Sequence, residues 1–90
     1  MRAVRIVVRG WVQGVGFRAH VVRIARELEL TGWVRNQSDG GVEAEAVGDE
    51  ASLRRFADAV RSGPVAGRVL ESTEQWIEVS KAGDGFHVVR

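Results

Sequence analysis

The amino-acid sequence predicts a single α+β domain in which two helices cover one face of a mainly antiparallel sheet. Three observations indicate this fold. Alternating apolar and polar residues mark short strands, apolar residues at helical spacing mark two longer segments, and these segments follow one another in the order β-α-β-β-α-β. This order forms a two-layer α/β sandwich, here with a short strand added at the C-terminal end.

The first strand and the first helix have clear patterns. Residues 3–12 alternate with a period of two, and the predicted core face consists of Val4, Ile6 and Val8. A loop over residues 13–17 follows. Helix one is expected from Arg18 to Leu30, with a buried stripe formed by Val21, Ile24, Ala25 and Leu28. Thr31-Gly32 would end it, with Gly32 in a left-handed turn.

The middle of the chain predicts a hairpin and the second helix. Strands over Trp33–Gln37 and Val42–Val47 are joined by Ser38-Asp39-Gly40-Gly41, a strong turn signal. In the second of these strands we expect the alanines to face the core, and Glu43 and Glu45 to face outward. Helix two begins after Asp49, a favourable N-cap, and ends at Ser62-Gly63-Pro64.

The last third of the chain predicts two strands, over residues 69–79 and 86–89. Ser72 and Glu74 are polar residues within the first of these strands. We therefore expect this strand to lie at a sheet edge or to contain a bulge, so that both side chains reach solvent. Two helices on one face of such a sheet give the ferredoxin-like arrangement.

Composition excludes several classes of function. Ninety residues form one domain, 1–90, and 44% apolar with 28% charged residues is typical of a globular protein. A net charge of +1 argues against a nucleic-acid partner, and the absence of cysteine excludes thiolate chemistry. No apolar run is long enough for a membrane span. We expect a cytoplasmic monomer without a membrane partner.

The most informative stretch is the glycine-rich loop between the first strand and helix one. Three glycines within seven residues, Gly10, Gly14 and Gly16, allow the backbone N–H groups to approach an anion at the helix N-terminus. Arg18 lies in the first helical turn, where the macrodipole disfavours a cation, and no acidic residue lies nearby to balance it. A bound anion between the loop and this guanidinium would remove the conflict.

Several interpretations of this loop compete. It lacks the lysine of a nucleotide-binding P-loop. Residues 14–19 match the dinucleotide pattern Gly-x-Gly-x-x-Ala, although the chain is short for that fold. The loop can also be a simple nest for an oxyanion, completed by Arg18, or a connection followed by a solvated arginine. Asn36 has two interpretations as well, because an asparagine before a hairpin turn commonly bonds the local backbone.

Two long blocks resemble the acylphosphatase family. They are Gly10-Trp11-Val12-Gln13-Gly14-Val15-Gly16-Phe17-Arg18 and Leu30-Thr31-Gly32-Trp33-Val34-Arg35-Asn36, followed by Asp39-Gly40-Gly41-Val42-Glu43. The resemblance implies an enzyme that hydrolyses the carboxyl–phosphate bond of acyl phosphates with neither metal nor cofactor, and for which inorganic phosphate or sulfate competes with the substrate. It implies catalytic roles for Arg18 and Asn36. The phosphate would be bound by the backbone of Gly14, Val15, Gly16 and Phe17 and by Arg18.

The sequence departs from the family pattern at Ala19, where an aromatic residue is frequent, so the rim of the pocket is expected to differ. A second class of function is also open. The chain could be a non-catalytic module that binds an anion or carbamoyl phosphate together with a partner protein. An RNA-recognition domain is disfavoured, because the aromatic signature on a central strand is missing. His20 is expected to be solvated. The three tryptophans are expected to pack on the sheet, and Trp33 could border the site.

Overall fold

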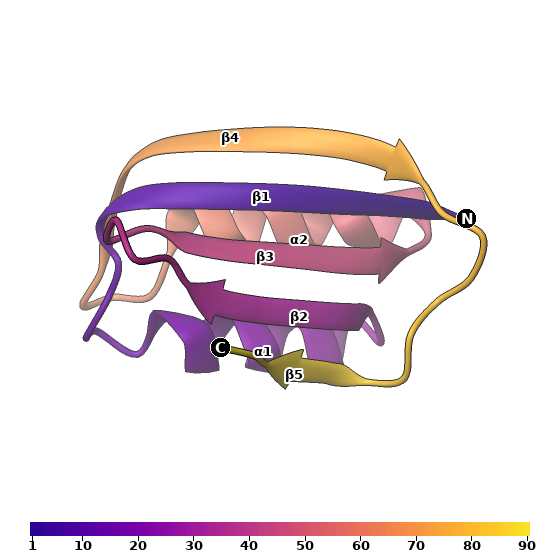
Figure 1. Cartoon of the computed structure of the whole chain (residues 1–90), viewed down its shortest axis with the longest axis horizontal. Helices are drawn as coiled ribbons and strands as arrows, with labels where there is room; N and C mark the ends of the chain where they lie inside the picture. The colour runs from indigo at the N-terminus through magenta and orange to yellow at the C-terminus, as the bar shows by residue number, and fades with distance from the viewer.

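The computed structural model describes all 90 residues, with five strands and two helices in the predicted order. The strands are β1 (Arg2–Trp11), β2 (Thr31–Asn36), β3 (Val42–Gly48), β4 (Arg68–Glu78) and β5 (Phe86–Val88), and the helices are α1 (Phe17–Glu27) and α2 (Glu50–Ser62). The strands lie in the order β4-β1-β3-β2-β5, and only the β2–β5 pair is parallel. Both helices cover the same face of the sheet (Figure 1). The predicted fold class is confirmed.

The sheet topology brings two chain segments to one edge. β1 and β2 both run antiparallel to the intervening β3, so they run in the same direction. Their C-terminal ends therefore lie at the same edge of the sheet, on either side of the start of β3 (Figure 1). In the register, Val8 of β1 faces Val42 of β3, which faces Asn36 of β2. Asn36 consequently lies beside the loop that leaves β1.

The core lies between the sheet and the helices. Seventeen buried apolar residues form one cluster, including the predicted stripe of β1 and the rings of Phe17, Phe56 and Phe86. The Phe56 and Phe86 rings lie 5.9 Å apart between centroids and are tilted by 59°. This contact joins α2 to β5, which is the edge strand on the other side of the sheet from β4. Neither helix has the length and apolar character needed to cross a membrane.

The end of α1 differs from the sequence-based expectation. The helix ends at Glu27 rather than Leu30, and the chain leaves it through Glu29, with φ 57°. Gly32 also has a positive φ, 143°, but it lies within β2 instead of ending the helix. Leu30 is buried beneath the sheet, and its N–H bonds to the carbonyl of Ala25. Gly32 already lies in β2 and pairs with Ala46 of β3. A Cβ at position 32 would collide with the backbone of Glu45. Burial of Leu30 ends the helix early, since the chain must turn back into the sheet.

β4 is an edge strand with a bulge, as predicted. Arg9 pairs with Glu71 and Gly10 pairs with Val69, so Leu70 is an extra residue and is 64% exposed. Beyond the bulge, Ser72 pairs with Val8 and is half-buried, whereas Glu74 is exposed. Both polar residues therefore reach solvent as expected, Ser72 only in part. The Glu74 carboxylate makes an ion pair with Arg61 of α2.

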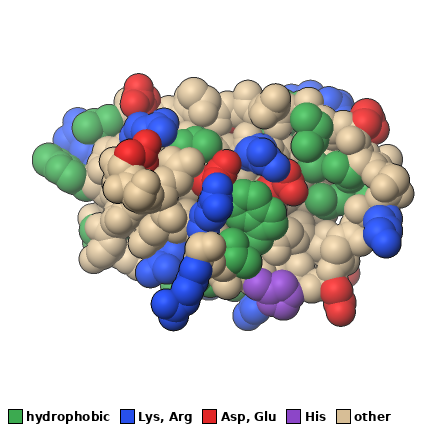
Figure 2. Space-filling model, viewed as in Figure 1, with side chains coloured by type: hydrophobic (Ala, Val, Ile, Leu, Met, Phe, Trp, Pro, Cys, Tyr) green, Lys and Arg blue, Asp and Glu red, His purple; other side chains and the backbone are tan.

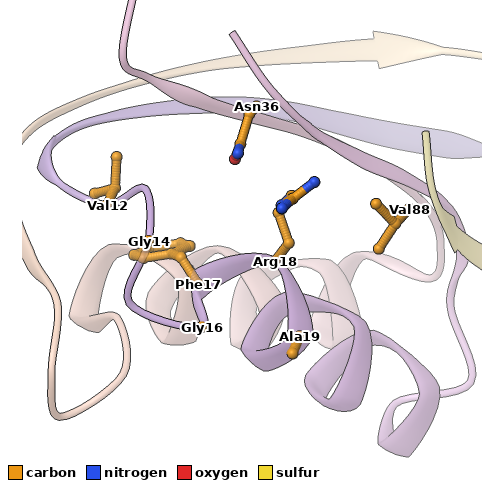
Figure 3. A pocket seen from close by; sticks show the side chains of 8 residues that line it. All are labelled: Val12, Gly14, Gly16, Phe17, Arg18, Ala19, Asn36 and Val88. Carbon is orange, nitrogen blue, oxygen red and sulfur yellow. The ribbon is translucent and has the colours of Figure 1, made fainter. Parts of the chain in front are cut away.

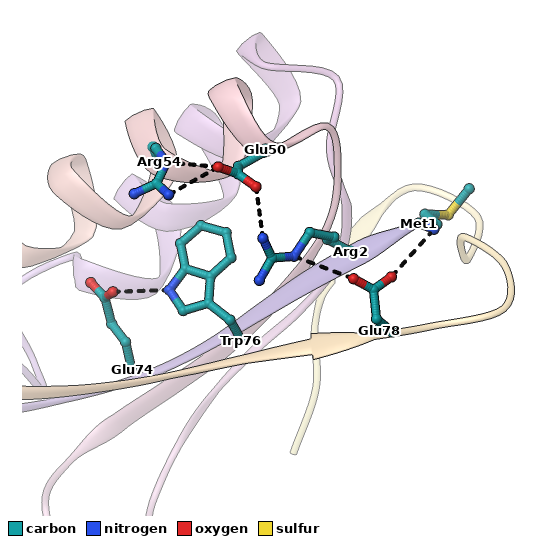
Figure 4. A network of polar contacts seen from close by, with 7 residues as sticks. All are labelled: Met1, Arg2, Glu50, Arg54, Glu74, Trp76 and Glu78. Carbon is teal, nitrogen blue, oxygen red and sulfur yellow. Dashed lines mark hydrogen bonds and ion pairs between the residues drawn. The ribbon is translucent and has the colours of Figure 1, made fainter.

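α2 begins as predicted, and polar contacts fix its first turn to the sheet. The Asp49 carboxylate accepts a hydrogen bond from the Ser52 N–H at 2.9 Å, which lowers the pKa of Asp49. Glu50 accepts hydrogen bonds from Arg54 and Arg2, and these lower the pKa of its carboxyl group. Both guanidinium groups lie over the Trp76 ring, at 5.4 and 5.1 Å (Figure 4). Trp76 therefore packs on the sheet as predicted.

The face of the sheet opposite the helices carries interspersed basic and acidic side chains (Figure 2). Glu43 lies on this face as expected, yet only 8% of the residue is exposed. Arg35 covers it with a hydrogen bond of 2.8 Å, and the Arg35 guanidinium also lies over Trp33. Arg5 lies over the same ring and pairs with Glu45. The basic and acidic side chains named here therefore form ion pairs with one another.

Candidate active site

The glycine-rich loop crosses from the end of β1 to the start of α1. Gly14 and Gly16 have φ of 77° and 79°, in the left-handed region that strains a residue with a side chain. Gly16 is the N-cap of α1, and no side chain bonds the free N–H groups of the first turn. These two glycines therefore give the loop its shape and leave its backbone accessible.

Four successive backbone N–H groups of the loop have no acceptor within the protein. They belong to Val15, Gly16, Phe17 and Arg18. No acidic residue lies in the first turn of α1 to meet their partial positive charge. Unpaired N–H groups at a helix N-terminus form a favourable binding site for an anion. The local geometry thus matches the anion nest predicted from the sequence.

Arg18 is exposed and makes neither an ion pair nor a hydrogen bond. Its side chain leaves the first turn of α1 and extends into the space between the loop and β2 (Figure 3). A guanidinium presents a planar set of N–H donors that can contact two oxygens of one phosphate. Arg18 therefore adds a full positive charge beside the backbone donors.

Asn36 is the last residue of β2, and its side chain points from the sheet toward the loop (Figure 3). Its Oδ1 atom is buried and has no hydrogen-bond partner. Burying a polar atom without a partner costs free energy, so this oxygen calls for a donor such as water. Asn36 makes no hydrogen bond to the hairpin backbone, in contrast to the alternative interpretation of its role.

These groups line one cavity of about 350 Å³. The lining residues are Val12, Gly14, Gly16, Phe17, Arg18, Ala19, Asn36 and Val88 (Figure 3). The volume lies within the range of roughly 300–1,000 Å³ that is usual for small-molecule sites. All of the predicted site residues except Val15 line this cavity, and the side chain of Val15 packs against the core instead. Val88 was not predicted, because its position depends on the parallel pairing of β5 with β2.

The sequence interpretation also missed a residue that fixes the loop. The Gln13 side-chain amide donates to the carbonyls of Gln37 and Gly41, each at 2.8 Å. Nearby, Arg9 bonds Asp39 at 2.8 Å, and this hydrogen bond lowers the pKa of the Asp39 carboxyl group. Both contacts hold the hairpin beside the end of β1. A glutamine at a loop entrance is compatible with solvent, so nothing in the sequence marked this role.

The predictions for Trp11 and His20 are wrong, whereas Trp33 packs on the sheet as predicted but does not border the site. Trp11 is 68% exposed rather than packed on the sheet. Trp33 lies on the face of the sheet opposite the cavity and does not line it. His20 is half-buried rather than solvated, because its ring contacts Phe17 at 6.2 Å between centroids and its Nδ1 lies 3.1 Å from Arg23. None of these side chains reaches the cavity.

Comparison with known proteins finds sequences and structures similar to this chain within one family. A family model described as Acylphosphatase matches residues 4–88. An acylphosphatase from Salinibacter ruber is 46% identical over 83 residues, which cover 92% of this chain and 87% of that protein. The crystal structure of acylphosphatase from Bacillus subtilis superimposes with a TM-score of 0.95 and 38% identity, and each chain is covered completely.

The same domain also occurs within a much larger protein. Carbamoyltransferase HypF2 from Cupriavidus necator is 46% identical over 87 residues. This match covers 96% of the present chain but only 11% of the carbamoyltransferase. Similarity over nearly the full length of both partners is therefore found with the small acylphosphatases.

Proposed function

The chain belongs to the acylphosphatase family and hydrolyses acyl phosphates, and we propose that residues 14–18 hold the phosphate group while Asn36 orients the attacking water. The reaction yields a carboxylate and inorganic phosphate. The observation that supports these roles best is that one cavity contains both the Arg18 guanidinium, which has no partner, and the buried Asn36 Oδ1, which has none either.

The phosphate group would lie in the loop between the unpaired N–H groups and Arg18. The backbone donors and the helix N-terminus meet the charge on its oxygens, and the guanidinium contacts two of them. Charge that spreads over the equatorial oxygens in the transition state is stabilised by donors that are already in place. This arrangement also explains a cation in the first turn of α1, since the bound anion lies between it and the helix dipole.

Asn36 would accept a hydrogen bond from a water molecule through Oδ1. An amide is a weak base, so its contribution is to position the water in line with the bond that breaks. The water oxygen attacks phosphorus, the phosphorus–carboxyl oxygen bond breaks, and the proton of the water passes to a phosphate oxygen. The leaving carboxylate is a weak base and departs without protonation, which suits a cavity lined by no Asp, Glu or His.

The same proposal has consequences for ligands and for the state of the protein. Inorganic phosphate and sulfate carry the charge and the oxygens that the loop binds, so both compete with the substrate. All the proposed site residues come from one chain, which supports a protein that acts as a monomer. A cytoplasmic location remains part of the proposal.

A non-catalytic module that binds carbamoyl phosphate with a partner is the weaker alternative. It rests on the similarity to the carbamoyltransferase, of which this chain covers only 11%. The acylphosphatases from Salinibacter ruber and Archaeoglobus fulgidus, in contrast, are matched over 87% and 86% of their own length.

Two variants test the division of roles. Arg18→Gln should abolish both turnover of acetyl phosphate and stabilisation by inorganic phosphate in thermal melts, because the charge and the forked donors are lost. Asn36→Ala should lower kcat by about 10²–10³ while phosphate inhibition stays near the parent value. A normal kcat for Asn36→Ala combined with a lowered Tm would assign Asn36 a purely structural role. Undiminished phosphate stabilisation of Arg18→Gln would exclude Arg18 from the anion site.

A further inference from the structure

The cavity of the proposed site adjoins a second hollow along α1. A groove of about 610 Å³ is lined by Ala19, Val22, Arg23, Arg26, Glu27 and Val88. Ala19 and Val88 line both spaces, so they form the junction between them. The residues from α1 recur at intervals of three and four, and they therefore lie along one side of the helix. From Ala19 to Arg26 this side is roughly 10 Å long.

We propose that this groove binds the acyl group of the substrate and that it selects acyl phosphates with an extended apolar chain. The inference rests on the phosphate site proposed above. In-line displacement places the leaving oxygen on the side of phosphorus opposite to the attacking water. In Figure 3 the Arg18 guanidinium lies between Asn36, at the end of β2, and the junction residues Val88 of β5 and Ala19 of α1. The acyl group consequently leaves the phosphate toward the junction.

The chemistry of the groove favours an apolar occupant. Ala19, Val22 and Val88 provide apolar surface, and 49% of Val88 is exposed. The arginines are already engaged. Arg23 contacts Glu27 at 3.6 Å, and Arg26 donates to the Phe86 carbonyl at 3.0 Å. Their aliphatic stems extend the apolar walls, while their charged ends are directed to these partners.

Ala19 is the residue that keeps the junction open. It is the residue of α1 that lines both spaces, and its side chain is a single methyl group. A phenylalanine at position 19 would fill the passage, and it would do so at an exposed helical position where the fold tolerates a large side chain. The size of residue 19 thus determines whether a long acyl chain can bind.

A series of straight-chain substrates tests the groove. Acetyl, butanoyl and hexanoyl phosphate have leaving carboxylates of similar basicity, so differences among them report on binding of the chain. Each buried methylene group increases affinity about fourfold. Burial of two of the four methylenes that hexanoyl phosphate adds would therefore raise kcat/KM more than tenfold over acetyl phosphate. We expect this increase in the parent protein, mainly through a lower KM.

Ala19→Phe should reduce the hexanoyl-to-acetyl ratio of kcat/KM at least tenfold. Ala51→Phe is the matched control, because it adds the same ring to an exposed helical position in α2, away from the cavity, and should leave the ratio unchanged. Val22→Ser provides a second variant, which removes apolar surface from the groove without filling the junction, and should also lower the ratio. Thermal melts of all variants establish that each one is folded.

Equal kcat/KM values for the three substrates in the parent protein would overturn the proposal. An unchanged hexanoyl-to-acetyl ratio of kcat/KM in both Ala19→Phe and Val22→Ser would overturn it as well. Preference for succinyl phosphate over hexanoyl phosphate would also overturn it, since Arg23 or Arg26 would then be binding a second anion. Failure of the phosphate site is distinguishable. In that case acetyl phosphate hydrolysis itself would be insensitive to Arg18→Gln, whereas equal kcat/KM values for the three substrates with Arg18-dependent hydrolysis contradict the groove alone.

Discussion

The side-chain amide of Gln13 donates a hydrogen bond of 2.8 Å to the carbonyl of Gln37, the residue that follows Asn36. The same nitrogen donates to the Gly41 carbonyl, which also accepts from the Gln37 N–H. Gln13 immediately precedes the anion-binding loop, so one side chain fixes the spacing between that loop and the end of β2. In the proposed mechanism, the relative position of the phosphate and the attacking water therefore depends on Gln13.

Replacing Gln13 should affect catalysis more than stability. Gln13→Ala removes two hydrogen bonds, each worth roughly 1 kcal/mol. A small displacement of the loop relative to Asn36 should lower kcat/KM for acetyl phosphate by on the order of tenfold to a hundredfold. Gln75→Ala is the matched control, because Gln75 is exposed on the edge strand β4. A Gln13→Ala protein with lower Tm but parental kcat/KM would limit Gln13 to a structural role.

Arg18→Lys should restore little of the activity lost in Arg18→Gln. An ammonium group keeps the charge but cannot contact two phosphate oxygens in one plane. Arg18→Gln should not destabilise the fold, and it should gain roughly 0.3–1 kcal/mol because a cation leaves the helix N-terminus. Arg55→Gln, at an exposed position of α2, controls for the change in net charge. Nearly full kcat/KM for Arg18→Lys would mean that charge alone suffices.

Hydrolysis of acetyl phosphate should continue undiminished in excess EDTA. The guanidinium and the backbone amides are the groups that meet the phosphate charge in the proposed site. Phenyl phosphate should be hydrolysed at least about 10²-fold more slowly, because its more basic leaving group needs a general acid that the cavity lining lacks. Loss of activity with EDTA, or comparable rates for the ester, would be inconsistent with the proposed chemistry.

The hairpin beside the site should weaken in acid. A hydrogen bond from Arg9, and a second one from the Gly41 N–H, hold the pKa of Asp39 below its ordinary value of 3.8. The stabilisation is present in full above 3.8 and is lost as the pH falls through the lowered pKa of the folded protein. The difference in free energy of unfolding between parent and Asp39→Asn should therefore shrink on acidification. Asp84→Asn, at an exposed turn position, is the control. A difference independent of pH from neutrality to strong acid would exclude this contribution of Asp39.

Much of the fold could be predicted from local patterns. The period of two in β1, the Asp49 N-cap and the turn before Val42 all agree with the structure, because each depends on neighbours within a few residues. The end of α1 was placed three residues too late and the turn at Glu29 was missed, since only burial of Leu30 decides where the helix must end. Polar residues within β4 predicted an edge strand or a bulge, but the position of the bulge at Leu70 was not predicted.

The sequence alone determined the local features of the proposed site. Gly14 and Gly16 specify a left-handed loop, and Arg18 specifies a cation in the first helical turn, because backbone freedom and helix electrostatics are local properties. Tertiary structure alone decided what meets that loop. The shared direction of β1 and β2 brings Asn36 to it, Gln13 fixes the spacing, and the parallel pairing of β5 places Val88 at the junction with the groove. These contacts join residues far apart in the chain, and their geometry depends on strand order and register, which no local pattern encodes.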